Sequence, residues 1–525
     1  MIIIPATCEF HTTIKKTNYY NMKYKLALPV LSVTSLFVQA QKPMNVVIIM
    51  DDQHRFDFTG YMGHPIIKTP NLDKLAQEGV AFENAYCVSP ISVPSRTSIF
   101  TGKYVHRTGK VFNDKELRTD EWTFVEPLKA KGYKIGIAGK NHCFTDKYLK
   151  TNFDYWEETG HWGRKYGTIT QTDKKVNEYF DHDPRPGFEK SKNMLEGLIP
   201  GPMPFPQEQC PTYRIAEDGI QFLEQNKEKP FMFYFSFGDP HWPTVVPEPY
   251  YSMYNPKDVI MPHADYDWKT APFKHFVQTQ AVCINNYTDA EKRRVIATYY
   301  GQITFVDHAI GMFLDKLKAL GLDKNTIVVF MSDHGDWGGN YGIIAKTGGF
   351  QETLIRVPMI VKIPGMTDQK RVKAQVSNID VLPTLFDYLG FTIPRNVQGK
   401  SFLKVLNGEK TEHRDVIFAE VGDAKAPPPA IDRKTFEQVR LKREKEEGMF
   451  WFIDYTTKGR SVMIRRDNWK YVFNTGFVNE LYDLKNDPYE MNNLIDKAKY
   501  KDKQASLSRE LMEWLLREPV TNMEP

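Results

Sequence analysis

Cysteine is scarce in this sequence and shows no metal-binding pattern. Five cysteines occur in 525 residues, and none pairs with another in a CxxC motif, so the signature of a structural zinc site is missing. Their spacing does not define any disulfide pairs either. Their state, free or paired, stays open for the four that lie beyond residue 40: Cys87, Cys143, Cys210 and Cys283.

A strong charge of either sign is also missing. The 69 basic and 65 acidic side chains give a formal net charge of +4, and no Lys/Arg-rich block or basic face stands out. The chain therefore lacks the electrostatic footprint of a protein that binds nucleic acid, and nucleic acid is not expected as a partner.

No apolar run near the N-terminus is long enough to cross a bilayer. The run at residues 26–38 follows two lysines and leads into the sequence Val-Gln-Ala at 38–40, as in a secretory signal peptide. We therefore expect a signal peptide at residues 22–40, cleaved after its last residue, with residues 1–21 as an upstream extension. The alternative is a buried first helix. The expected product is periplasmic or secreted, without membrane insertion.

Four short apolar runs, rich in β-branched and aromatic residues, predict buried parallel strands. They are residues 45–50, 134–139, 231–237 and 326–332. Helical patterns lie between them: Thr69 and Pro70 open a helix that ends at Gly79, and apolar residues recur every three or four positions between 303 and 320. This alternation predicts an α/β fold, with a large, mixed, mostly parallel sheet sandwiched by helices.

The chain changes character after about residue 390. Residues 424–448 are rich in proline and then in charged side chains, which indicates a solvated linker or lid. Two strand-like runs and one amphipathic helix pattern follow, at 460–466, 469–475 and 503–517. We therefore predict a catalytic α/β domain at residues 42–390 and a smaller α+β subdomain at 391–525, with a small antiparallel sheet and a terminal helix.

Each of the four predicted strands is followed by ionisable side chains. In strand order, these residues are Asp51 and Asp52, Lys140 and His142, Asp239 and His241, and Asp333 and His334. Because ligands bind beyond the carboxyl ends of the strands of an open parallel sheet, we expect these side chains to converge at that edge. One such pair could be ordinary charged residues of a solvated loop. Four pairs, one after each predicted strand, are difficult to explain in that way.

The chemistry of these groups divides by type. The three carboxylates of Asp51, Asp52 and Asp333 are hard oxygen ligands, suited to Ca²⁺ or Mg²⁺. The imidazoles of His142 and His241 can transfer protons near neutral pH. Cations from Lys140, Lys346 and Arg96 can neutralise a bound oxyanion. Such a set suits the transfer of a charged tetrahedral group, which depends mostly on charge stabilisation and alignment.

The stretch VSPISVPSRTSIFTG at residues 88–102 resembles the (Cys/Ser)-x-Pro-x-Arg signature of the type I sulfatases, a family of the alkaline-phosphatase superfamily. The signature falls on Ser92, Pro94 and Arg96. The other motifs of the family occur in order: DDQ at 51–53, GKNH at 139–142, DPHWP at 239–243, SDHG at 332–335, RVPMIVK at 356–362 and NELYDLKNDPYEMNNL at 479–494. The resemblance covers residues 44–517 and implies an alkaline-phosphatase-like fold with sulfatase activity.

In this family the signature residue is oxidised to formylglycine, and the hydrated aldehyde is the nucleophile. The resemblance therefore implies that Ser92 is the formylglycine precursor. One hydroxyl of the hydrate attacks sulfur, and the other later expels sulfate and regenerates the aldehyde. A serine at this position also implies a transient partner, a sulfatase-maturating enzyme of the anaerobic radical type.

The resemblance further implies a role for each polar residue at the sheet edge. A divalent metal, Ca²⁺ or alternatively Mg²⁺, would be bound by Asp51, Asp52, Asp333, His334 and the formylglycine from Ser92. Arg96 and Lys140 would hold the diol, and Lys140 and Lys346 would hold the sulfate oxygens. His142 would accept a proton during sulfate release. His241 would protonate the leaving alcohol with help from Lys346.

The sequence says less about the alcohol that leaves than about the nucleophile and the metal ligands. An exported Ser-type enzyme fits glycan degradation, so we expect an exo-acting enzyme for sulfated carbohydrate, such as glycosaminoglycan-derived oligosaccharides, with 2-O-sulfated uronate as one option. Trp162, Arg164 and Trp242 are candidate substrate contacts, with a plain core or surface role as the competing interpretation. Two alternatives stay open: a phosphoester or phosphonate monoester hydrolase, and a non-catalytic sulfated-glycan binding protein in which Ser92 is unmodified.

Overall fold

The structure is a computed structural model that describes most of the chain. The described residues are 43–113, 116–118, 120–161, 163–181, 200–263, 287–346, 348–366, 371–423 and 459–517. The expected signal peptide at 22–40, the extension at 1–21 and the charged segment 424–448 lie outside them. Residues Lys42–Pro525 group into one compact unit, so the expected domain boundary after residue 390 stays a prediction.

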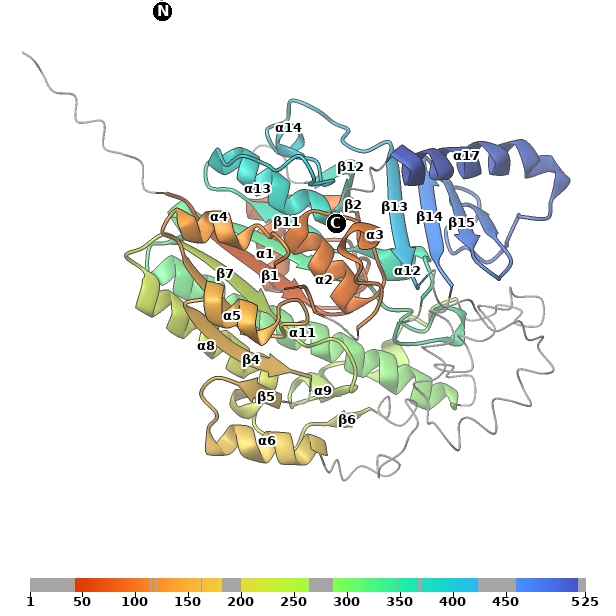
Figure 1. Ribbon diagram of the computed structural model, residues 1–525. Coiled ribbons are helices and arrows are strands. Elements are labelled where there is room, and N and C mark those ends of the chain that lie inside the picture. The colour runs from red at the N-terminus through yellow and green to blue at the C-terminus, as the bar shows by residue number, and fades with distance from the viewer. Residues whose placement is uncertain are drawn as a thin grey trace, which may run out of the picture. The chain divides into compact units, whose positions relative to one another are not determined.

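A large sheet forms the centre of this unit (Figure 1). Among the described residues it has ten strands in the order β10-β2-β11-β9-β1-β7-β3-β4-β5, with β12 beside β2. The consecutive strands β9, β1, β7 and β3 are parallel, and they are the four predicted from the apolar runs. The predicted mixed, mostly parallel sheet is confirmed. The strands are β1 Asn45–Asp51, β2 Val80–Tyr86, β3 Lys134–Gly139, β4 Tyr155–Gly160, β5 Gly163–Tyr166, β7 Phe231–Ser236, β9 Thr326–Ser332, β10 Arg356–Val357, β11 Met359–Lys362 and β12 Arg371–Ser377; β6 Gly201–Pro202 and β8 Val245–Val246 form a separate pair.

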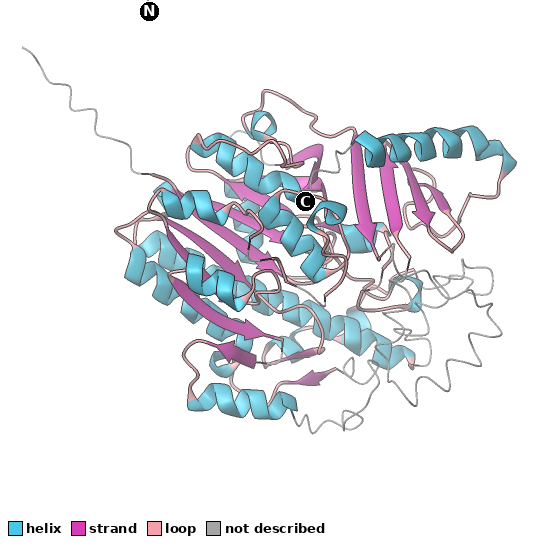
Figure 2. Ribbon diagram, viewed as in Figure 1, coloured by secondary structure: helices cyan, strands magenta, loops and turns pink. Residues whose placement is uncertain are grey.

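Strand β1 is buried on both faces, which is why its sequence is a continuous apolar run. Val46, Ile48 and Met50 pack into one apolar cluster, and Val47 and Ile49 pack into a second, as the alternation of side chains along a strand requires. Helices lie on both sides of the sheet (Figure 2). Side chains of α2, α4, α5 and α13 contribute to the first cluster, and side chains of α1, α8 and α11 contribute to the second.

Helix α1 (Pro70–Glu78) starts where the sequence predicts, but for a different reason. The side chain of Thr69 makes no capping hydrogen bond to the helix. Instead, its hydroxyl accepts a hydrogen bond from the Gly60 amide and donates one to the Asp73 carboxylate. Thr69 therefore joins the helix to the preceding loop, with Pro70 in the first turn.

The apolar pattern at 303–320 belongs to a longer helix, α11 (Asp289–Ala319). It begins with a capping box between Thr288 and Glu291. No helix in the described residues is both long and apolar enough to span a bilayer. The remaining helices are α2 Ser92–Thr101, α3 Val105–Thr108, α4 Val125–Ala130, α5 Asp146–Asn152, α6 Gln171–Asp181, α8 Pro211–Asn226, α9 Tyr250–Met253, α12 Glu352–Ile355, α13 Val381–Leu389, α14 Leu403–Leu406 and α17 Lys501–Arg517.

A second, antiparallel sheet forms the C-terminal subdomain, drawn in blue in Figure 1. Its strands pair in the order β13 (Val416–Val421), β14 (Ser461–Arg466), β15 (Trp469–Asn474) and β16 (Glu480–Asp483). Leu507 and Leu511 of α17 pack against its apolar face. The small antiparallel sheet and the terminal helix are therefore as predicted.

The described cysteines are free thiols. Cys87, Cys143 and Cys210 are buried and unpaired, whereas Cys283 lies outside the described residues. Burial raises the pKa of each of the three thiols above its usual value, so they remain protonated and unreactive near neutral pH.

Gly139, at the end of β3, should not tolerate a side chain. Its φ is +97°, and a Cβ there would lie 1.8 Å from the carbonyl oxygen of Ser236 on the neighbouring strand. Gly139→Ala should therefore lower the free energy of unfolding by roughly 3 kcal/mol. Gly132→Ala is the matched control, since Gly132 has φ +83° and nothing within 4 Å of its Cβ position, and it should cost about 1 kcal/mol. Denaturant unfolding measures both, and equal losses would contradict the packing argument.

Candidate active site

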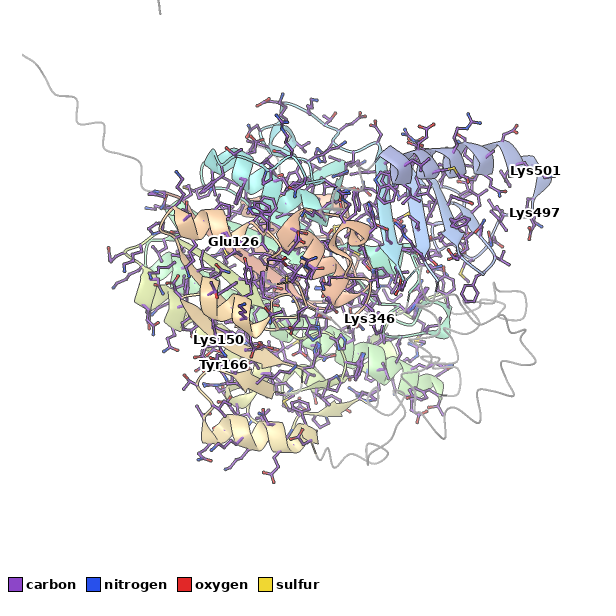
Figure 3. The ribbon with its side chains drawn as sticks, in the orientation of Figure 1. Glu126, Lys150, Tyr166, Lys346, Lys497 and Lys501 are labelled. Carbon is purple, nitrogen blue, oxygen red and sulfur yellow. The ribbon has the colours of Figure 1, made fainter. Side chains whose placement is uncertain are left out.

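Ser92, the first residue of α2, lies in a polar cluster at the carboxyl edge of the sheet. Its Oγ is 3.0 Å from His334 Nε2 and accepts a hydrogen bond of 2.9 Å from Lys346 Nζ. Lys346 lies near the centre of the view in Figure 3, whereas Lys501 lies at the rim. The structure thus brings together three predicted site residues that are far apart in the sequence.

Arg96 holds this end of α2 against the sheet. Its guanidinium, with no solvent exposure, contacts Asp333 at 2.7 Å and Asp52 at 2.9 Å. It also donates to the hydroxyls of Tyr234 (2.6 Å) and Ser236 (2.8 Å) on β7. Burial alone would lower the pKa of Arg96, but Tyr234 and the two carboxylates raise it above its usual value, so the guanidinium stays charged.

Three of the predicted metal ligands form one compact donor group. The ligand atoms of Asp52, Asp333 and His334 lie within 4.8 Å of one another, and all three side chains are buried. Oδ1 of Asp52 and Oδ1 of the adjacent Asp51 find no hydrogen-bond donor among the described residues. Buried carboxylate oxygens need a donor or a cation. This donor set therefore fits a hard divalent cation such as Ca²⁺ or Mg²⁺.

Asp51 is held by a histidine that the sequence analysis did not identify. His54 Nδ1 lies 2.5 Å from Asp51 Oδ2, and His54 Nε2 lies 3.0 Å from the carbonyl oxygen of Phe58. Burial would lower the pKa of His54, but Asp51 raises it above its usual value. With an acceptor at each nitrogen, the ring is favoured as imidazolium, and only Oδ1 of Asp51 is left for a metal.

His334, in contrast to His54, is held as the neutral imidazole. Its Nδ1 donates to the carbonyl oxygen of Gly335 at 2.9 Å, which leaves Nε2 as the acceptor that faces Ser92. Burial lowers the pKa of His334 to about 4. The ring is therefore neutral at physiological pH, and this is the form that binds a metal.

Two lysines flank Asp52. Lys140 Nζ donates to Asp52 Oδ2 and lies 2.7 Å from His161 Nε2, while Lys346 Nζ lies 3.7 Å from Asp52 Oδ1. Burial would raise the pKa of Asp52, but the two lysines and Arg96 hold it well below its usual range. Burial lowers the pKa of Lys140 to about 7, although Asp52 opposes that shift.

His161 was not singled out in the sequence, yet the structure places it between two predicted site residues. It accepts from Lys140 and stacks on His241, with ring centroids 3.9 Å apart. The predicted His142 lies farther away, edge-on to His161 at 6.5 Å, and its Nδ1 has no partner among the described residues. Burial lowers the pKa of all three rings. No strand is predicted before His161, so no local sequence pattern marks it as a site residue.

Asp52, His161 and His241 form a second group with metal-like spacing. The ammonium of Lys140 is bonded to both Asp52 and His161. A lysine therefore already supplies positive charge there, and the group is satisfied without a second metal. His241 Nδ1 donates to the carbonyl oxygen of Trp242 at 2.5 Å, which leaves its Nε2 for proton transfer.

The three expected substrate contacts have different outcomes. Trp162 lies outside the described residues. Arg164 is only 2% exposed, and its guanidinium pairs with Glu157 (2.5 Å) and Asp218 (2.6 Å). These ion pairs give Arg164 a structural role, which corrects the expectation that it meets the substrate. Trp242 is partly buried and lines a pocket beside the site, with residues that include Ile344 and Ala345 next to Lys346.

The sequence profile of one protein family, the sulfatases, matches residues 44–391 of the chain. An ulvan-active sulfatase of Formosa agariphila is 30% identical over 484 residues, which covers 89% of this chain and 80% of that protein. An N-acetylglucosamine-6-O-sulfatase of Bacteroides thetaiotaomicron is 26% identical, with coverage of 95% and 91%.

Solved structures share the fold. The phosphonate monoester hydrolase of Agrobacterium radiobacter superposes with a TM-score of 0.72 at 23% identity, covering 91% of this chain and 96% of that one. At this level of identity, the likeness concerns the fold and not the reaction.

Metal binding should be measurable without an activity assay. In protein stripped with EDTA, Ca²⁺ should raise the melting temperature by a few degrees, since a ligand at 100 times its Kd adds about 2.7 kcal/mol to stability. Asp52→Asn should abolish this rise. Asp239→Asn is the matched control, because the Asp239 carboxylate lies at the same sheet edge but is bonded to Thr212 and Gln302. A Ca²⁺ response that survives in Asp52→Asn would contradict the assignment.

Proposed function

Since the chain belongs to the sulfatase family and hydrolyses sulfate esters, we propose that it is an exported carbohydrate sulfatase that acts through a formylglycine made from Ser92. The observation that carries this proposal is the position of Ser92. Its Oγ lies at the start of a helix, 2.9 Å from Lys346 Nζ and beside the Asp52, Asp333 and His334 donor group. A nucleophile there is surrounded by the charges that a sulfuryl transfer needs.

The cations of the chain bind and orient the sulfate ester. Lys346 contacts Ser92 directly, and Lys140 is bonded to Asp52 Oδ2, so we assign both ammonium groups to the sulfate oxygens. Every nitrogen of the Arg96 guanidinium donates to a carboxylate, a hydroxyl or a carbonyl oxygen. We therefore propose that Arg96 orients the metal ligands and the helix start, in place of the expected contact with the diol.

Ca²⁺, with Mg²⁺ as the alternative, would be held by Asp52, Asp333, His334 and the residue at position 92, with Asp51 Oδ1 as a further ligand. The bound ion supplies positive charge that lowers the pKa of the nucleophile and stabilises developing negative charge. The hydrate of formylglycine at position 92 would supply one hydroxyl as the nucleophile toward sulfur, with departure of the alcohol, and a second hydroxyl that, on losing its proton, would expel sulfate and restore the aldehyde. A maturating enzyme of the radical type would install it before export.

Proton transfer falls to the imidazoles. Burial lowers the pKa of His241 well below its usual value, its Nδ1 donates to the carbonyl oxygen of Trp242, and its ring lies near Lys346 and Asp52. This arrangement supports His241 as the group that delivers a proton to the leaving alcohol. His161 positions Lys140 and His241 through its hydrogen bond and its stacking contact. His142, buried near Arg96 and Lys140, remains our candidate to accept a proton during sulfate release.

The proposed substrate is an O-sulfated sugar from a glycosaminoglycan or a similar glycan, cleaved in exo fashion. The names of the relatives support this class: one is an ulvan-active sulfatase and another an N-acetylglucosamine-6-O-sulfatase. Trp242 offers an aromatic face beside the site that suits a sugar ring. A 2-O-sulfated uronate is one specific candidate.

Maturation tests the nucleophile directly. Co-expression with a radical maturating enzyme should remove about two mass units from the tryptic peptide that contains Ser92, and Ser92→Ala should abolish that change and lower kcat by about 10³-fold or more. Ser98→Ala is the control, because Ser98 is a buried serine of the same helix whose hydroxyl has no partner in the described residues. An active protein without the mass change would overturn the formylglycine proposal.

A substrate panel tests the leaving group and the second candidate function. We expect sulfate release from at least one sulfated mono- or disaccharide, and hydrolysis of a sulfate ester at least about tenfold faster than that of the phosphate or phosphonate ester of the same alcohol. The fold shared with a phosphonate monoester hydrolase makes the reverse order the specific alternative. Tight binding of sulfated glycan without any turnover would instead support a binding protein.

A further inference from the structure

The C-terminal sheet carries a lysine with no solvent exposure, Lys470 on β15. Its ammonium donates to the carbonyl oxygen of Phe350 at 2.7 Å and to Glu490 Oε1 at 2.7 Å, and it pairs with Glu352 Oε1 at 2.9 Å. A buried ammonium is stable only when it is paired and hydrogen-bonded. Two of its three partners, Phe350 and Glu352, belong to the segment that follows Lys346.

Glu490 strengthens this connection from the other side. Its Oε2 accepts a hydrogen bond of 2.7 Å from the backbone amide of Glu352, at the start of α12, where the amides of a helix lack internal partners. Glu490 has φ +54°, a conformation that a non-glycine residue adopts only when the surroundings enforce it. Here the enforcement comes from Asp487, whose carboxylate accepts from the amides of Met491 and Asn492.

These contacts explain the spacing of the motif NELYDLKNDPYEMNNL, which the proposed reaction does not use. Asp487 closes a turn, and Asn493 fixes that turn to β16 through the amide of Leu481. This turn places Glu490 next to Lys470 and Glu352. The backbone carbonyl oxygen of the neighbouring Tyr489 accepts a hydrogen bond from the hydroxyl of Tyr341. The motif therefore forms a surface of the C-terminal subdomain that contacts Tyr341, Phe350 and Glu352, on both sides of Lys346 in the sequence.

The docked segment carries and supports the site. Lys346 lies within it, and the preceding Ala345 has φ +64°; the carbonyl oxygen of Ala345 accepts from the amide of Trp337. Downstream, the carbonyl oxygen of Leu354 in α12 accepts from the amide of Gly335, directly after His334. These backbone hydrogen bonds join the segment to the loop that follows β9, and the contacts of Glu352 and Phe350 with Lys470 and Glu490 join it to the C-terminal sheet.

We propose that Lys470 and Glu490 are positioning residues of the catalytic site: they fix residues 348–355 and, through them, hold Lys346 and His334 in place around Ser92. The role assigned to Lys346 rests on the proposed function. The contacts that join Lys470 and Glu490 to residues 348–355 do not depend on that function. Neither residue touches the reacting groups. The C-terminal subdomain thus contributes to catalysis through one buried ion cluster.

Hydrogen exchange tests the mechanical link independently of any substrate. Lys470→Met should accelerate exchange of amides in peptides that cover 335–355 by about tenfold, with no change in β1. The matched control is Leu507→Ala, because Leu507 of α17 is buried against the same sheet, in a cluster that includes no residue of 335–355. When the two variants are compared at an equal loss of melting temperature, Leu507→Ala should leave 335–355 protected. Equal exchange in the two variants would overturn the proposal.

Kinetics tests the consequence, with the sulfated sugar that the wild-type protein hydrolyses fastest. Lys470→Met and Glu490→Gln should each lower kcat about 10- to 100-fold while KM changes less, and Lys470→Arg should recover at least part of the loss. Glu490→Gln keeps the size of the side chain, so it serves if Lys470→Met does not fold. A folded variant that exchanges faster in 335–355 but keeps the kcat of the wild type would show that the docked segment does not position Lys346. That outcome would refute the proposed effect of Lys470 and Glu490 on catalysis.

Discussion

The buried guanidinium of Arg96 is the group on which the geometry of the site depends. It joins carboxylates that follow two strands, Asp52 after β1 and Asp333 after β9, to hydroxyls on a third strand, β7. Since Arg96 lies about one turn after Ser92, the same contacts fix the start of α2 at the sheet edge. Neither the helix nor either carboxylate can move without leaving a buried charge unpaired, at a cost of about 3–5 kcal/mol. The Ser-x-Pro-x-Arg spacing therefore has a structural reason as well as a chemical one.

Around this core, the charges fit the cation and the sulfate ester of the function that we propose. Asp52 is shared by Arg96 and Lys140 through one oxygen, while its other oxygen has no donor among the described residues. The free oxygen faces the donor group that includes His334, whose pKa of about 4 keeps it neutral. A divalent cation held there would share the carboxylate charge that Lys140 and Lys346 otherwise neutralise. The two ammonium groups would then attract a sulfate ester more strongly.

The sequence predicted the parts of the site that depend on strand order and missed those that depend on side-chain neighbours. Strands buried on both faces give continuous apolar runs, so β1, β3, β7 and β9 and the residues after them could be located. His161 and Arg164 lie where β4 and β5 pair with a register shift, which no local pattern defines. Arg164 of β5 pairs with Asp218 on α8, and a single basic residue in a sequence gives no sign that it is buried among carboxylates.

The same distinction applies to the C-terminal subdomain. Its strands and its final helix follow from local patterns, but the role of its longest motif appears only when Lys470 and Glu490 are seen against Glu352. Lys346 belongs to an irregular segment with residues at positive φ, and a conformation of this kind persists when the surrounding structure enforces it. The role that we propose for Lys346 requires a fixed position, so that its charge acts without reorganisation. The second sheet meets that need, which gives a physical reason for the large domain and the small one to form one compact unit.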